Sequence, residues 1–198
     1  MNTRIRLDEE LGRDAVRSLI YRYLKEMPDG MEETPARVLR AWDHMLQGYE
    51  MERNLQDWMT SFDGEQYSGI VLLANIEFYS TCEHHLLPFH GVGHVAYIPD
   101  QMDQSKVIGI SKLARILETY ARRFQMQERI AMQVVDCLEK YLSPLGSACI
   151  LEGKHFCMMC RGVEKQNSSM VTSSMKGVFD TKPEARAELM QLIQMTKS

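Results

Sequence analysis

The segment Cys82-Glu83-His84-His85 places a thiol and an imidazole three residues apart, in a polar connection between two predicted strands. Thiolate and imidazole groups at such a spacing are typical zinc ligands. A second cluster, His155-Phe-Cys-Met-Met-Cys-Arg161, adds two thiols and another histidine. Together the two clusters predict a zinc site built from distant parts of the chain.

Two kinds of zinc site are compatible with these clusters. A closed structural site fills all four tetrahedral positions, here with Cys82, His85, Cys157 and Cys160. A catalytic site has three protein ligands and keeps the fourth position for water. If the segment is a strand, Cys157 and Cys160 point to opposite faces, which favours the catalytic site. A sharp turn at residues 157–160 would favour the closed site.

Two histidines are candidates for proton transfer. In the catalytic site His84 and His155 would not bind the metal, and imidazole titrates near physiological pH. The alternative is that they support the ligands or contribute only surface polarity.

A further set of polar residues suggests phosphate and base recognition. Ser111, Lys112 and Arg115 open a predicted helix, where free backbone amides and basic side chains bind phosphate, although such a face is usually just solvated. Arg161 lies close to the predicted metal in sequence. Glu128 opens the next predicted helix, where it either favours the positive helix end or accepts hydrogen bonds from a guanine ring.

Composition narrows the class of protein. The 198 residues are 44% hydrophobic with a net charge of -4 and no long basic block, which argues against a general nucleic-acid or membrane-surface binder. No segment approaches the roughly 20 apolar residues of a membrane span, and no secretory signal is evident. Five cysteines suit a reducing compartment. We therefore expect a cytoplasmic protein, and the missing G-x-x-x-x-G-K-[ST] sequence argues against a P-loop NTPase.

Hydrophobic periodicity predicts an α+β domain that follows an N-terminal helical hairpin. The hairpin helices are expected near residues 8–28 and from Thr34, with Asp8 and Thr34 as N-caps. Strands, helices and strands then follow in the order ββααββ, near 69–79, 91–98, 110–124, 126–142, 147–159 and 170–179. Thr181-Lys-Pro-Glu184 resembles a capping box that opens a last helix.

Several of these segments together resemble GTP cyclohydrolase I of the zinc type. The matching strings, in order over residues 30–195, are Glu33-Thr-Pro-Ala-Arg37, Ser80-Thr-Cys-Glu-His-His-Leu-Leu-Pro88, Val107-Ile-Gly-Ile-Ser-Lys-Leu-Ala-Arg115, Gln125-Met-Gln-Glu-Arg129, His155-Phe-Cys-Met158, Arg161-Gly-Val163 and Val171-Thr-Ser-Ser-Met175. The resemblance implies a tunnelling fold, with an antiparallel ββααββ sheet and two core helices, over residues 67–198, with residues 1–66 forming the N-terminal helical region. It also implies a homodecamer whose active sites lie between subunits.

By the same resemblance, Cys82, His85 and Cys157 hold Zn2+, and GTP is the substrate. Guanine would be anchored by Glu128 and the backbone of Gln127. The groups expected to face ribose and triphosphate are Ser111, Lys112, Arg115, Arg161 and, from a neighbouring chain, Arg37.

The implied reaction opens the imidazole part of guanine, releases formate and gives 7,8-dihydroneopterin triphosphate. His155 would protonate the ring, with His84 and Ser111 assisting later steps. Cys160 departs from the family pattern, in which methionine is expected. The alternatives are a zinc-stabilised binding module without turnover and a related tunnelling-fold enzyme acting on another purine or pterin.

Overall fold

The computed structural model describes residues 9–100 and 106–196. These residues form two compact units that divide between Leu46 and Gln47. The boundary expected between residues 66 and 67 falls inside the second unit. No helix in the described ranges is long and apolar enough to cross a bilayer.

The first unit contains helix α1 (Glu9–Tyr21), a 3-10 turn η1 (Asp29–Met31) and helix α2 (Thr34–Met45). Helices α1 and α2 approach closely at Gly12, where an added Cβ would lie 3.0 Å from the Leu39 side chain. A glycine at this point therefore permits the close contact.

The predicted helix ends in this unit need correction. Helix α1 stops at Tyr21 rather than near residue 28. The N-cap of α2 is Glu33, without a side-chain capping bond, and Thr34 is already helical ahead of Pro35. The expected N-cap Asp8 lies outside the described residues.

The second unit carries a mixed five-stranded sheet of order β5-β2-β3-β6-β7, in which only β5 runs parallel to its neighbour. A separate pair joins β1 to β4. The unit is therefore α+β, as predicted, but its sheet is mixed rather than wholly antiparallel, because β5 runs parallel to β2. Its elements are α3 (Gly48–Arg53), α4 (Leu55–Trp58), β1 (Ser61–Asp63), β2 (Val71–Cys82), β3 (Pro88–Ile98), β4 (Lys106–Ile108), α5 (Ile110–Ala121), β5 (Phe124–Gln125), α6 (Gln127–Leu142), β6 (Gly146–His155), α7 (Phe156–Met159), β7 (Met170–Gly177), α8 (Val178–Thr181) and α9 (Pro183–Met195).

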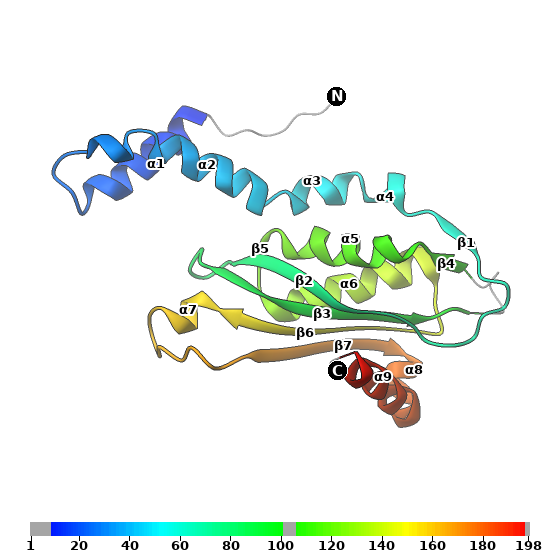
Figure 1. Ribbon diagram of the computed structural model, residues 1–198. Coiled ribbons are helices and arrows are strands. Elements are labelled where there is room, and N and C mark those ends of the chain that lie inside the picture. The colour runs from blue at the N-terminus through cyan, green and yellow to red at the C-terminus, as the bar shows by residue number, and fades with distance from the viewer. Residues whose placement is uncertain (1–8, 101–105, 197–198) are drawn as a thin grey trace. The chain divides into compact units, whose positions relative to one another are not determined.

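The main core lies between the sheet and helices α5 and α6, which run across one face of the sheet (Figure 1). Each helix buries one apolar stripe, including Leu113 and Leu117 in α5 and Ile130 and Val134 in α6. Part of the opposite face is covered by α8 and α9 around the buried Phe179. Helices therefore pack against both faces of the sheet.

Several predicted boundaries in this unit are wrong. The strand expected near residues 170–179, for example, ends at Gly177, and α8 follows it. Strand β6 ends at His155, whereas the sequence predicted a strand to residue 159, and residues 156–159 form the helical turn α7. The last register pair is His155 with Phe89, next to Pro88 at the start of β3. A proline offers no N–H, so the ladder has no donor with which to continue.

The last helix also starts differently from its prediction. Helix α9 has Lys182 as its N-cap, without a side-chain capping bond. The Thr181 hydroxyl instead donates to the Gly177 carbonyl, 3.0 Å away, within the turn α8. The predicted capping box therefore does not form.

Candidate metal centre and surrounding site

The two cysteine clusters lie close together because only strand β3 lies between the strands that lead to them, β2 and β6. Strand β3 pairs with both β2 and β6, so that Ser80, Phe89 and His155 lie side by side across three strands. Cys82 is two residues beyond Ser80, and Cys157 is two residues beyond His155. The chain therefore brings the two thiols to the same end of the sheet (Figure 1).

Cys82, His85 and Cys157 form a group that could hold a metal ion, since their ligand atoms all lie within 4.8 Å of one another. The Cys82 Sγ is 3.9 Å from Nδ1 of His85. Burial and the neighbouring Cys82 thiol raise the pKa of Cys157, because a thiolate there would be desolvated beside a second sulfur. A bound cation would relieve that cost, so the donor set fits a thiophilic metal.

Cys160 lies outside this group, although the strand-parity reason for excluding it was wrong. Residues 156–159 turn as a helix, so strand parity does not apply. The Cys160 thiol is exposed and contacts the Phe156 carbonyl, 3.0 Å away, in its own turn. Within the described residues the metal group has three members.

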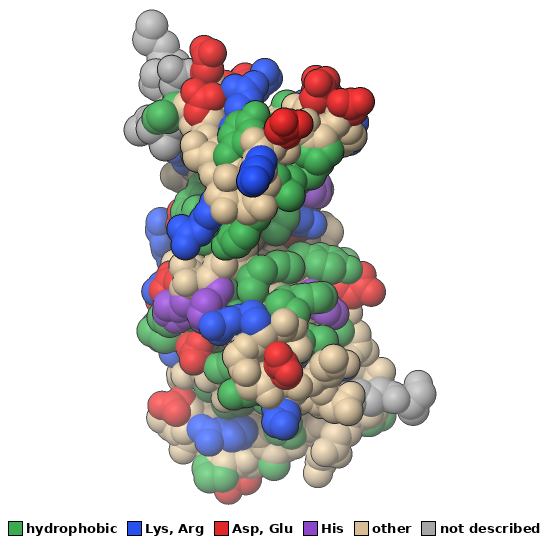
Figure 2. Space-filling model, turned by 90° about the vertical axis from the view of Figure 1, so that its left-hand side faces the viewer, with side chains coloured by type: hydrophobic (Ala, Val, Ile, Leu, Met, Phe, Trp, Pro, Cys, Tyr) green, Lys and Arg blue, Asp and Glu red, His purple; other side chains and the backbone are tan. Residues whose placement is uncertain are grey.

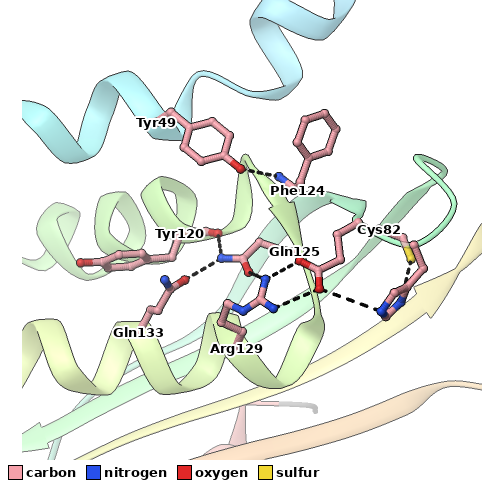
Figure 3. A network of polar contacts seen from close by, with 9 residues as sticks. Tyr49, Cys82, Tyr120, Phe124, Gln125, Arg129 and Gln133 are labelled. Carbon is pink, nitrogen blue, oxygen red and sulfur yellow. Dashed lines mark hydrogen bonds and ion pairs between the residues drawn. The ribbon is translucent and has the colours of Figure 1, made fainter.

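The ligand loop is held in place by Glu83, which was not among the predicted site residues. Arg129 on α6 makes a bidentate ion pair with Glu83. The Nη2 atom of Arg129 donates to Oε1 of Glu83 at 3.0 Å, and Nη1 donates to Oε2 (Figure 3). The Glu83 amide also donates to the Gln125 carbonyl, 3.1 Å away. Arg129 lowers the pKa of Glu83, which keeps the carboxylate charged. We call this Glu83–Arg129 pair the loop clamp.

Gln125 connects the loop clamp to the core. Its Nε2 donates to the Tyr120 carbonyl at 2.8 Å and to Oε1 of Gln133 at 2.6 Å (Figure 3). Its own Oε1 lies 3.5 Å from Nη1 of Arg129. The metal ligands are thus anchored through the clamp to helix α6.

Two more predicted site residues lie beside the metal group. Nδ1 of His84 is 4.0 Å from the Cys82 sulfur, and Nη1 of Arg161 is 3.4 Å from Nε2 of His85. Both side chains are exposed. Figure 2 shows this end of the protein, where histidine side chains reach the surface next to Lys and Arg.

His155, the last residue of β6, is half-buried. Its ring stacks on Phe89 with centroids 4.3 Å apart and planes 7° from parallel. Its Nε2 lies 3.0 Å from the side-chain oxygen of Gln127. Burial lowers the pKa of His155, and the nearby Glu128 carboxylate opposes this by favouring the charged ring.

Apart from Arg161, the predicted phosphate residues of the second unit do not join the metal group within one chain. Ser111, Lys112 and Arg115 lie on the first turns of α5, just after Ile108, whose amide donates to the Tyr97 hydroxyl at 3.1 Å. Strand β3 runs eight residues from Phe89, beside His155, to Tyr97. At about 3.3 Å per residue, the Phe89 and Tyr97 ends of this strand are roughly 26 Å apart.

The remaining predicted residues divide between the two units. Glu128 is exposed in the first turn of α6, next to the buried Gln127. Arg37 is exposed on α2 in the first unit. Gln127 was predicted to act only through its backbone, and its side chain was missed because its bonding partners are 24 or more residues away.

The loop clamp leads to a testable prediction. Arg129→Lys keeps the positive charge but loses the bidentate contact with Glu83, because an ammonium group is a point charge. We expect the affinity for metal to fall about tenfold, the effect of losing an outer contact to a ligand loop. A Co2+ titration followed by thiolate absorption measures this affinity.

The matched control is Arg122→Lys. Arg122 also pairs with a glutamate, Glu118, at 2.6 Å, but this pair lies at the C-terminal end of α5 and includes no member of the metal group. We expect the Arg122 variant to bind Co2+ like the unmodified protein. Equal Co2+ affinity in both variants would show that the clamp does not position the ligands.

Comparison with known proteins shows which family the chain resembles. The family model for GTP cyclohydrolase I matches residues 13–194. The GTP cyclohydrolase 1 of Deinococcus radiodurans is 47% identical over 175 residues, which cover 86% of this chain and 78% of the relative. That of Leptospira biflexa is 47% identical over 166 residues, or 84% of this chain and 88% of the relative.

A more distant relative covers nearly the whole chain. The GTP cyclohydrolase 1 of Thermoanaerobacter pseudethanolicus is 39% identical over 193 residues, 96% of this chain and 100% of its own length. With the family model spanning both units, these matches lead to one conclusion: the chain belongs to the GTP cyclohydrolase I family.

Proposed function

We propose that this chain uses a zinc ion held by Cys82, His85 and Cys157 to open the guanine imidazole ring of GTP. The observation that carries the proposal is the meeting of these three donors beside His155, itself in contact with the helix that bears Glu128. The products expected are formate and 7,8-dihydroneopterin triphosphate. This reaction needs a nucleophile, a proton donor and a base anchor.

The donor set supports zinc. Two thiols and one imidazole are soft to borderline ligands, and three protein ligands are typical of catalytic zinc. When bound in such a site, zinc supplies Lewis acidity and lowers the pKa of coordinated water toward neutrality. The exposed Cys160 thiol turns back to its own backbone, which supports an open fourth position.

The proton donor and base anchor lie at the start of α6 and the end of β6. The Glu128 carboxylate is exposed, and could accept hydrogen bonds from the ring imino group and exocyclic amine of guanine. The backbone of Gln127 would contact the same base. His155 would deliver a proton to the imidazole nitrogen of the substrate, and His84, 4.0 Å from the Cys82 sulfur, would serve later proton transfers.

We expect the purified zinc form to release formate from GTP and to give a product that fluoresces after oxidation. Glu128→Ala should raise the KM for GTP by about tenfold or more and leave the zinc content unchanged, because it removes a charge-assisted contact to the base. Formate assays and metal analysis measure both effects.

Glu184→Ala is a suitable control, since this glutamate lies on the first turn of α9. It should leave the KM unchanged. A folded, zinc-loaded protein without formate release would show a binding module rather than an enzyme, and an unchanged KM in Glu128→Ala would refute the base anchor.

The active site is proposed to need a second chain. Arg161 lies at the metal end of the sheet, but Ser111, Lys112 and Arg115 lie roughly 26 Å away along β3. A triphosphate cannot reach both ends of one chain. A neighbouring subunit that presents its α5 to this metal group would supply the missing basic residues, and a ring assembly such as a homodecamer does this for every site.

Mixed oligomers test the shared site. Cys82→Ala removes a metal ligand and Arg115→Ala removes a phosphate contact, so each variant alone should be nearly inactive. In oligomers assembled from equal amounts, about one quarter of the sites combine an intact metal group with an intact Arg115. We therefore expect activity to return toward that fraction of the unmodified level.

The two variants are mixed after dissociation and reassembly, and formate release is measured before and after. Light scattering confirms that oligomers have formed again. No recovery in reassembled oligomers would contradict a site shared between chains, as would full activity in an isolated monomer.

A further inference from the structure

Gln127 has a fixed amide orientation. The side chain is 1% exposed, and its Nε2 lies 3.2 Å from the Leu151 carbonyl, 2.9 Å from the Met170 carbonyl and 3.1 Å from Oγ1 of Thr172. Backbone carbonyls only accept hydrogen bonds. The atom that faces two of them must therefore be the NH2 group, and the amide cannot be flipped.

The amide oxygen of Gln127 consequently faces His155. Its Oε1 lies 3.0 Å from Nε2 of the imidazole. An amide oxygen is an acceptor only, so the imidazole nitrogen must donate. A neutral imidazole carries one N–H, and placing it on Nε2 leaves Nδ1 with the free lone pair.

The surroundings keep the ring and the amide in this arrangement. The imidazole stacks flat on Phe89, and Gly153 leaves the space that the amide occupies, since a Cβ there would lie 2.3 Å from Oε1 of Gln127. Throughout residues 9–100 and 106–196, Nδ1 of His155 meets no hydrogen-bond partner. This nitrogen is the one available to a ligand.

We infer that the Gln127 side chain is a positioning residue that holds neutral His155 in its Nε2–H tautomer, so that Nδ1 is the atom that carries the transferred proton. This rests on the proposed function of His155 as the proton donor. The Nδ1–H bond of the imidazolium breaks, and the proton forms a bond to the imidazole nitrogen of the purine. The ring is left neutral, with its Nε2–H still bonded to Gln127.

The tautomer can be observed without turnover. Zinc-loaded oligomer with 15N-labelled histidine is sedimented and studied by magic-angle-spinning NMR at a pH where His155 is neutral. The His155→Asn variant, which lacks the signals, assigns them. We expect a pyrrole-type signal from Nε2 and a pyridine-type signal from Nδ1; the reverse pattern would overturn the inference.

Two variants separate positioning from packing. Gln127→Met has similar length but neither donor nor acceptor, so both His155 tautomers should appear, with a fall in kcat of about 10-fold to 100-fold. Thr172→Val removes only one of the three acceptors around the amide. Because both carbonyls remain, this variant should keep the single tautomer and a kcat within about twofold of the unmodified protein.

The KM for GTP and the zinc content should change little in either variant, since the Glu128 carboxylate and the Gln127 backbone that would anchor the base are kept, as are the metal ligands. A single Nε2–H tautomer in folded, zinc-loaded Gln127→Met would refute the positioning role. If the protein released no formate at all, the proposed function would fail while the NMR result on the unmodified protein still tested the tautomer.

Discussion

The pairing of β3 with both β2 and β6 is the constraint on which the site depends. Its register sets Ser80, Phe89 and His155 side by side, and this places the thiols of Cys82 and Cys157 at one end of the sheet. Gly91 permits that pairing, because a Cβ there would lie 1.9 Å from the Glu152 carbonyl. A register slip of one residue would turn one ligand to the other face.

The same strand explains why one chain carries only part of the proposed site. Metal ligands lie where β3 begins, and the basic first turns of α5 lie where it ends, near Tyr97. A strand of this length separates the two groups by more than a triphosphate can span. In the proposed function, catalysis therefore depends on assembly, because each chain carries the two parts of the active site at opposite ends of its sheet.

Much of this arrangement was predictable from the sequence. Apolar periodicity predicted the main strands and helices, and the two cysteine clusters with the family strings pointed to the three residues that form the candidate metal group. The end of β6 was not predictable, because the helical turn at residues 156–159 follows from the register of His155 against Phe89 beside Pro88. Glu83 contacts Arg129 across 46 positions of sequence, and Gln127 contacts His155 across 28. No local sequence pattern predicts such contacts.

The proposed metal centre has three protein ligands and an open position, although a third cysteine, Cys160, lies three residues beyond Cys157. X-ray absorption at the zinc edge measures the ligands directly in the loaded protein. We predict two sulfur atoms at about 2.3 Å, one imidazole nitrogen at about 2.0 Å and one further light atom. Three sulfur atoms around the zinc would contradict this claim, because Cys160 would then close the site.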